Sequence, residues 1–188
     1  MAMVHLEIDG RKVEVPEGAS VLEAARSAGA DIPTLCHIEG LEPYGGCRLC
    51  LVEIEGFRNG LASACSTPAA EGMRVGTATD LVVALRREVL SLILAEHPSD
   101  CFNCKKSGDC GLHRYCAEYG VVKTITGDEK RDSVPDISSP FISLDRNKCI
   151  LCGKCVRVCE RLQLCDVLDF SRRGRGTRIG PAFDLSLA

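Results

Sequence analysis

The chain opens with apolar and polar residues in alternation. Residues 4–8 and 12–15 each place apolar side chains at every second position, which is the period of a half-buried strand. Asp9 and Gly10 stand between the two segments, and glycine adopts a positive φ without steric cost. The pattern predicts an antiparallel hairpin closed by a tight primed turn.

A capped helix and further strands are expected after the hairpin. Ser20 precedes Glu23 by three residues, the spacing of a capping box, and Gly29 is a favourable residue after a helix end. These signals predict a helix over residues 21–28. Short strands are expected at residues 51–55 and 61–64. Together the elements predict an α+β unit of the β-grasp kind over residues 1–78.

The longest helical period lies in the middle of the chain. Apolar residues recur there about every 3.6 positions, which predicts a helix that starts at Thr79 or Asp80 and stops before His97-Pro98. The apolar positions are Leu81, Leu85, Val89, Leu92 and Ile93. Arg86, Arg87 and Glu88 are predicted to face solvent.

The remaining sequence divides by composition. A second short helix is expected after Asp109 and ends at Gly120, so residues 79–125 are predicted to form a small helical domain. Residues 126–140 are polar, charged and proline-containing, as is typical of a linker. Residues 141–188 are predicted to form a compact cysteine-rich unit.

The cysteine content changes this picture from a plain α+β protein to a metalloprotein. The chain has 13 cysteines among 188 residues, an odd number, and no apolar leader precedes Glu7. Thiols stay reduced in the cytoplasm, so we expect a cytoplasmic protein that uses its cysteines for metal and not for disulfides. The net charge of −3 favours neither nucleic acid nor an anionic membrane as a partner. Charged residues interrupt the most apolar segment, residues 81–95, so no transmembrane helix is expected.

The first cysteine group is Cys36, Cys47, Cys50 and Cys65. Its centre follows Tyr44-Gly45-Gly46, where glycines let backbone N–H groups approach inorganic sulfide. Plant-type ferredoxins place their [2Fe–2S] ligands in the same order with a shorter first gap. The alternative is a zinc site of four cysteines.

The second group is His97, Cys101, Cys104 and Cys110. Four such ligands on so short a segment can hold one metal centre. An imidazole in place of a thiolate removes negative charge from a cluster and raises its potential. The spacing leaves three interpretations open, namely an iron–sulfur cluster, a zinc site of three cysteines and one histidine, or a histidine that only ends a helix.

The third group is the run Cys149-x2-Cys152-x2-Cys155-x3-Cys159. Bacterial ferredoxins use this spacing, with the first three cysteines on one [4Fe–4S] cluster and the fourth on a neighbouring cluster. Two cysteines lie outside the three groups. We expect Cys116 to be a small buried side chain, whereas Cys165 is a candidate substitute ligand.

The order of the three motifs resembles the N-terminal iron–sulfur region of iron-only hydrogenases. It is similar also to the diaphorase-side subunit of NAD-reducing hydrogenases, to related formate dehydrogenases and to the large iron–sulfur subunit of complex I. The resemblance covers essentially all 188 residues. It implies a [2Fe–2S] cluster on the first group and a [4Fe–4S] cluster on each of the other two. The implied ligands are Cys36, Cys47, Cys50 and Cys65; His97, Cys101, Cys104 and Cys110; and Cys149, Cys152 and Cys155.

The sequence departs from the hydrogenase pattern after Cys159. Those proteins carry a second run of four cysteines shortly downstream, and this chain reaches Ala188 without one. Cys159 is therefore expected to be either the fourth ligand of the third centre or a ligand of a neighbouring cluster. We expect the third centre to be incomplete in these residues and the natural polypeptide to continue past Ala188.

Electron transfer is the function that the resemblance implies. The sequence holds no dinucleotide-binding or P-loop motif, so no catalytic centre is expected within it. The implied role is the electron-transfer part of an NAD-linked hydrogenase, formate dehydrogenase or NADH dehydrogenase. Its partners would be a flavin-containing NAD(H)-oxidising subunit and a further redox subunit, in a hetero-oligomer. The competing prediction is a zinc-stabilised protein-interaction module, with the arginines of residues 172–178 as its partner surface.

Overall fold

The computed structural model describes residues 2–57, 59–122 and 133–187, which form two compact units. One unit comprises Met1–Leu90 and Gly111–Val121, and the other comprises Ser91–Cys110 and Val122–Ala188. The domain limits expected at residues 78, 125 and 140 stay predictions. Residues 126–132 of the predicted linker lie outside the described residues.

The N-terminal hairpin is confirmed. Strand β1 (Met3–Ile8) pairs antiparallel with β2 (Arg11–Pro16), and Val4 lies opposite Val15. Asp9 and Gly10 have φ values of 49° and 78°, and a type I′ turn needs a positive φ at both positions. The turn therefore forms at the dipeptide that predicted it.

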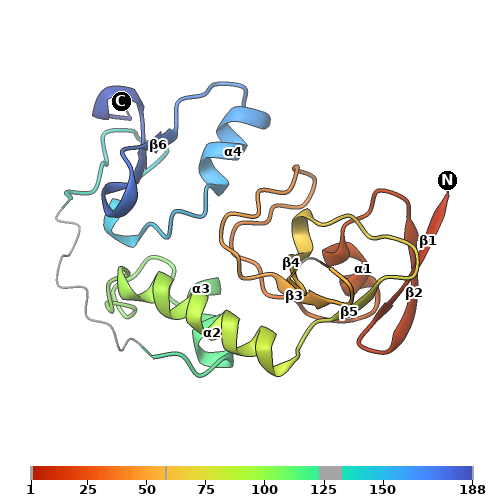
Figure 1. Cartoon of the computed structure of the whole chain (residues 1–188). Helices are drawn as coiled ribbons and strands as arrows, with labels where there is room; N and C mark the ends of the chain where they lie inside the picture. Colours follow the sequence, from red (N-terminus) through yellow and green to blue (C-terminus); the bar gives the residue numbers. More distant parts are fainter. Residues whose placement is uncertain (1, 58, 123–132, 188) are drawn as a thin grey trace. The chain divides into compact units, whose positions relative to one another are not determined.

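The hairpin belongs to a mixed five-stranded sheet in the order β2-β1-β5-β3-β4 (Figure 1). The predicted strands are β3 (Leu51–Ile54) and β4 (Leu61–Ser63), which pair antiparallel and lead into a 3-10 turn, η1 (Ala64–Ser66). The sequence did not predict β5 (Arg74–Gly76), because three residues are too few to show alternation. This strand runs parallel to β1 and antiparallel to β3, so it joins the two halves of the sheet.

Helix α1 (Val21–Ser27) packs against the sheet and has the predicted capping box. The Glu23 N–H donates to Ser20 Oγ at 3.2 Å, and the Ser20 N–H donates to Glu23 Oε2 at 2.7 Å. Four buried residues of α1 share one apolar core with β1, β2, β3 and β5. The core side chains of these elements are Val21, Leu22, Ala24, Ala25, Leu6, Ile8, Val15, Val52, Ile54 and Val75.

Helices α2 (Asp80–Ala95) and α3 (Gly111–Glu118) lie where the sequence predicted helices, but the predicted faces of α2 are only partly correct, because Arg87 and Glu88 are exposed and Arg86 is buried. Its buried residues are Val82, Arg86 and Leu90, which are four positions apart and form one stripe. Leu81 and Leu92, which were expected to face the core, are exposed. The error arises because an arginine in the buried stripe is polar in any hydropathy pattern.

The second unit contains helix α4 (Lys154–Arg161) and a small antiparallel pair, β6 (Asp169–Ser171) and β7 (Arg178–Gly180). Three 3-10 turns accompany them: η2 (Arg146–Lys148), η3 (Gly174–Gly176) and η4 (Ala182–Asp184). Asp136 and Leu144 exchange two backbone hydrogen bonds of 2.9 Å. No helix in the described part of the chain has the length and hydropathy to cross a lipid bilayer.

Candidate metal centres

The first cysteine group comes together in the first unit as two pairs of sulfur atoms. Cys50 Sγ lies 3.4 Å from Cys65 Sγ. Cys36 and Cys47 form the other pair, because their thiols share a hydrogen bond and the Cys47 N–H lies 3.5 Å from Cys36 Sγ. The charge of Cys47 also acts on Cys50 and on Cys65, so the two pairs lie within electrostatic reach of one another.

Glycines shape the loop that carries these sulfurs. Gly45 has a φ of 64°, and a side chain at Gly46 would overlap the Tyr44 ring. The backbone N–H of Gly45 donates to Cys65 and that of Gly46 to Cys36. Amides at both positions therefore stabilise negative charge on the cysteine sulfurs, whereas the expected approach of amides to inorganic sulfide stays a prediction.

Within each pair the two thiols differ in acidity. The hydrogen bond from Cys36 lowers the pKa of Cys47 to about 5, and the same bond together with burial raises the pKa of Cys36. In the second pair the hydrogen bond from Cys50 lowers the pKa of Cys65 to about 7, while the pKa of Cys50 is raised. Because metal ligation requires thiolates, an iron between two such sulfurs would take the place of the shared proton.

The donor set fits a binuclear centre. A [2Fe–2S] cluster takes four thiolates, two on each iron, and the structure offers four thiols as two pairs, with backbone amides that donate to the sulfurs. A zinc site of four cysteines would use the same thiols around one point.

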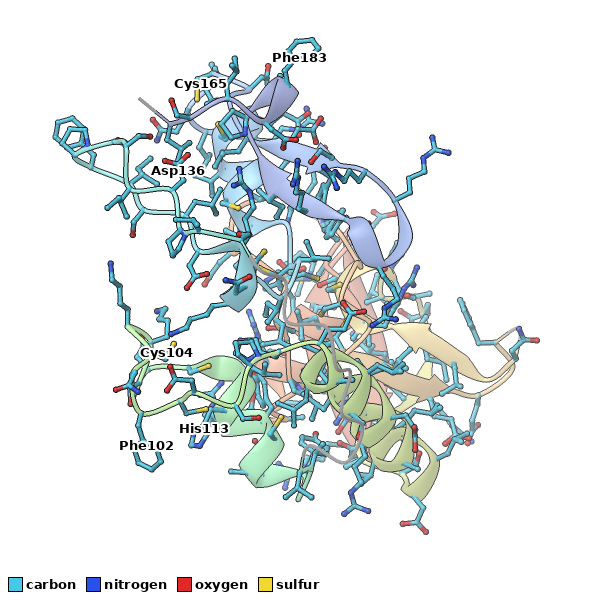
Figure 2. The ribbon with its side chains drawn as sticks, turned by 90° about the vertical axis from the view of Figure 1, so that its left-hand side faces the viewer. Phe102, Cys104, His113, Asp136, Cys165 and Phe183 are labelled. Carbon is cyan, nitrogen blue, oxygen red and sulfur yellow. The ribbon has the colours of Figure 1, made fainter. Side chains whose placement is uncertain are left out.

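The second group lies on the segment between the end of α2 and the start of α3. Tight turns fold this segment, because the Cys104 N–H donates to the Cys101 carbonyl at 3.3 Å and the Ser107 N–H donates to the Cys104 carbonyl at 2.9 Å. The Lys106 N–H donates to Cys104 Sγ at 3.5 Å. Figure 2 shows the Phe102 side chain directed outward, away from Cys104, and this ring is 98% exposed.

His97 has the surroundings of a metal-binding histidine. Its Nδ1 atom lies 2.9 Å from the Pro98 carbonyl oxygen, which can only accept a hydrogen bond. Nδ1 therefore carries the proton of the neutral ring, and the lone pair is on Nε2. Histidines that ligate metal through one nitrogen commonly donate from the other to a carbonyl in this way.

The third group surrounds the start of α4. Gly153 caps this helix with a φ of 70°, and the Leu151 N–H donates to Cys149 Sγ at 3.4 Å. Burial raises the pKa of the Cys155 thiol, and the charges of Cys149 and Cys152 raise it further. A metal that neutralised these thiolates would relieve their repulsion.

The structure adds Cys165 to this region. Cys159 Sγ lies 3.1 Å from Cys165 Sγ, and the Cys165 N–H donates to the Cys159 carbonyl at 3.2 Å. Cys159 is buried on α4 and Cys165 is exposed. Cys116, the other cysteine outside the three groups, is buried in α3 as the sequence predicted.

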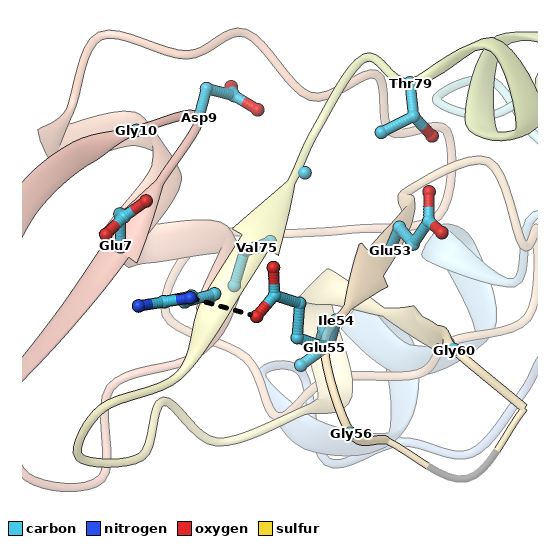
Figure 3. Close-up of a pocket in the computed structure, with 12 residues that line it drawn as sticks. Glu7, Asp9, Gly10, Glu53, Ile54, Glu55, Gly56, Gly60, Val75 and Thr79 are labelled. Carbon is cyan, nitrogen blue, oxygen red and sulfur yellow. Dashed lines mark hydrogen bonds and ion pairs between the residues drawn. The ribbon is translucent and has the colours of Figure 1, made fainter.

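A pocket of about 460 Å³ in the first unit has a different character (Figure 3). Acidic residues of β1 and β3 line it, and no cysteine does. Glu55 pairs there with Arg74 at 3.3 Å, and Asp9 accepts a hydrogen bond of 2.7 Å from the Thr77 N–H. Two of its acidic side chains therefore already interact with other residues of this unit.

Three groups of soft ligands in this order, on an α+β scaffold, define a protein with several iron–sulfur centres. Three known families match the same parts of the chain. They are described as a 2Fe-2S iron-sulfur cluster binding domain over residues 1–80, an NADH-ubiquinone oxidoreductase-G iron-sulfur binding region over residues 86–124, and a 4Fe-4S binding domain over residues 141–164. The predicted cluster types, [2Fe–2S] and [4Fe–4S], are thereby confirmed.

Known proteins extend the likeness to nearly the whole chain. The chain is 41% identical to the NADP-reducing hydrogenase subunit HndD of Solidesulfovibrio fructosivorans, over 100% of this chain and 33% of that protein. It is also 41% identical to an NADH-quinone oxidoreductase subunit of Rhizobium meliloti, over 99% of this chain and 22% of that protein. It thus spans a third or less of the length of these two relatives.

A solved structure also matches this chain in fold. A chain of an NAD⁺-reducing [NiFe]-hydrogenase in the H₂-reduced state matches with a TM-score of 0.85 and 32% identity, over 96% of this chain and 76% of that chain. The chain therefore belongs to the family of iron–sulfur subunits of NAD(P)-linked hydrogenases and NADH dehydrogenases. The resemblance inferred from its cysteine motifs is confirmed.

Proposed function

We propose that this chain relays single electrons between a flavin-containing, NAD(H)-oxidising subunit and a second redox site. The observation that carries the proposal is the first cysteine group, in which the glycine-containing loop meets Cys65 of η1 and the four sulfurs form two pairs that accept hydrogen bonds from backbone amides. Two further ligand groups follow along the chain, which suits a relay of several centres. The electrons themselves reside on the iron–sulfur clusters, whose potentials depend on charge, hydrogen bonds to sulfur and exposure.

Each ligand group has one proposed cluster. Cys36, Cys47, Cys50 and Cys65 hold the [2Fe–2S] cluster, with one sulfur pair on each iron. His97, Cys101, Cys104 and Cys110 hold the first [4Fe–4S] cluster, and Cys149, Cys152 and Cys155 hold three corners of the second. Cys159 or its neighbour Cys165 supplies the fourth ligand, or Cys159 serves an adjacent cluster. The mixed sheet with α1 packed on it supports a β-grasp fold for the [2Fe–2S] domain.

The surrounding residues hold the ligands and adjust their charge. Backbone amides at Gly45 and Gly46 donate to the sulfurs of the first group. His97 brings a neutral ligand to the second group, and the Pro98 carbonyl fixes the position of its proton. No residue of the chain needs to act as an acid or a base in this role, since electron transfer forms and breaks no bond to hydrogen here.

The relatives support a multi-subunit assembly. Their names describe subunits of hydrogenases and NADH-quinone oxidoreductases, so this chain is proposed to work in a hetero-oligomer. The flavoprotein partner and the cytoplasmic location are proposed from the resemblance of the cysteine motifs and from the reduced thiols. Identification of the subunits that co-purify with the full-length natural protein, by mass spectrometry, tests this part. Purification of that protein without any flavin-binding partner would contradict it.

Iron and sulfide analysis tests the cluster assignment. If all three sites fill on anaerobic reconstitution, one [2Fe–2S] and two [4Fe–4S] clusters give about ten irons and about ten sulfides per chain. The preparation should be brown and should bleach with dithionite, and Cys116→Ser, outside the three groups, should keep its full iron content. About two irons per chain would refute three centres, and a colourless, zinc-loaded protein would establish the interaction module instead.

A further inference from the structure

Arg86 is the only charged side chain that is buried among the described residues, with 2% of its surface exposed. It lies on α2, in the stripe that faces the sheet domain. Its Nη1 donates to Tyr119 Oη at 2.9 Å, and its Nη2 donates to the Leu51 carbonyl oxygen at 2.8 Å. Its Nε is buried without a hydrogen-bond partner in the described part of the chain.

The partners of Arg86 do not balance its charge. The Tyr119 hydroxyl and the Leu51 carbonyl are both neutral, and no aspartate or glutamate of the described residues forms an ion pair with it. Burial of a charge that lacks an opposite charge is costly. Among the described residues, therefore, no negative group offsets the buried charge of Arg86.

The proposed [2Fe–2S] centre is such a group. Leu51 directly follows Cys50, and standard bond lengths place the Arg86 guanidinium within about 12 Å of Cys50 Sγ. Four thiolates and two sulfides outweigh the charge of two ferric irons, so the centre is negative, and reduction makes it more so. A buried cation at this range favours the reduced state, and salt screens it far less than an exposed cation.

We propose that Arg86 is the buried countercharge of the [2Fe–2S] centre and raises its reduction potential. This inference rests on the proposed assignment of Cys36, Cys47, Cys50 and Cys65 to that cluster. Arg86 touches none of these sulfurs through a hydrogen bond in the structure, so it acts through its charge and through the Leu51 carbonyl that it holds. Arg86 would therefore adjust the potential of the centre without binding a cluster atom.

The test is a redox titration of the reconstituted full chain, followed by the electron paramagnetic resonance signal of the reduced [2Fe–2S] cluster. Arg86→Met is expected to lower the midpoint potential, whereas Arg86→Lys keeps the charge and most of the potential. Arg87→Met is the matched control, because Arg87 is exposed, adjacent in sequence and bonded to the same residue, the Tyr119 carbonyl, at 3.0 Å. It removes the same net charge and should leave the potential nearly unchanged.

If Arg86→Met does not fold, a second pair of variants tests whether the charge of Arg86 raises the potential. Tyr119 is only half-buried, and Tyr119→Glu would bring a carboxylate to the guanidinium and cancel its charge. We expect Tyr119→Glu to lower the potential and Tyr119→Phe, which leaves the charge intact, to preserve it. Equal potentials in Tyr119→Glu and Tyr119→Phe, or equal shifts in Arg86→Met and Arg87→Met, would overturn the inference.

The outcomes also separate this inference from the proposed function. A wild-type chain with no [2Fe–2S] signal would defeat the cluster assignment itself. A normal wild-type signal with an unchanged potential in the folded Arg86→Met protein would leave the assignment standing and show that Arg86 only holds α2 and α3 to the sheet domain.

Discussion

His97 offers a sharp test of the second centre, because one substitution changes the charge of the cluster without removing a ligand. His97→Cys replaces a neutral imidazole with a thiolate. The structure favours a ligand role for this ring, since the contact of Nδ1 with the Pro98 carbonyl leaves the lone pair on Nε2. The added negative charge opposes reduction, so the potential of the cluster should fall.

Electrostatics gives the size of this fall. One unit charge added about 5 Å from the cluster centre, at an effective dielectric constant of about 20, costs about 3 kcal/mol. For a one-electron couple this corresponds to about 130 mV. Because Cys101 is exposed and His97 is only half-buried, water enters the loop and the shift should lie near about 100 mV.

The assay is a titration of the [4Fe–4S] signals by electron paramagnetic resonance, with His113→Ala as the control. His113 is an exposed histidine of α3 outside the ligand groups (Figure 2), so its replacement should leave every potential in place. His97→Ala should lose or degrade the cluster. An unchanged titration in both His97 variants would show that His97 only ends α2.

Two further predictions concern the stability of the fold and of the third centre. Ser20→Ala removes the cap acceptor of Glu23 and should cost about 1 kcal/mol. For a chain of this size the thermal midpoint at pH 7, followed by circular dichroism, should fall by about 2–4 °C, with the exposed Ser186→Ala as the control. Under a chelator the third centre should release its iron first, about four of about ten irons, because only three of its thiolates come from one tight run. A third cluster that resists the chelator, and that is abolished only by Cys159→Ser, would show instead that this chain completes the centre by itself.

The sequence predicted the elements that are determined by residues close together in the chain. The Asp9-Gly10 turn and the Ser20–Glu23 cap depend on residues within a few positions of one another, so their chemistry can be read along the chain. Strand β5 could not be predicted in this way, because its three residues become a strand only by pairing with β1 and β3.

The candidate centres also combine features that local sequence predicts with features that depend on distant residues. Spacing predicted the three candidate ligand groups, because cysteines a few residues apart can reach a common centre. It could not show that Cys36 pairs with Cys47 and Cys50 with Cys65, because Cys65 reaches the loop through β3 and β4. The contact of Cys159 with Cys165 depends on a change of chain direction after α4. Leu164 has a φ of 53° there, and a leucine in the sequence does not predict a positive φ.

Arg86 was misassigned for a physical reason that bears on function. Periodicity assigns apolar residues to the core and polar residues to the surface. A buried arginine such as Arg86 is therefore assigned to the wrong face. The proposed first centre thus has a buried cation nearby, whereas Lys105, Lys106 and Lys154 beside the other two groups are exposed and Lys148 is only half-buried. Salt and a covering surface act strongly on exposed charges and weakly on buried ones. If Arg86 is the countercharge that we propose, we expect the fold of this chain to set the potential of the first centre, and we expect the potentials of the other two proposed centres to depend also on any partner surface that covers their loops.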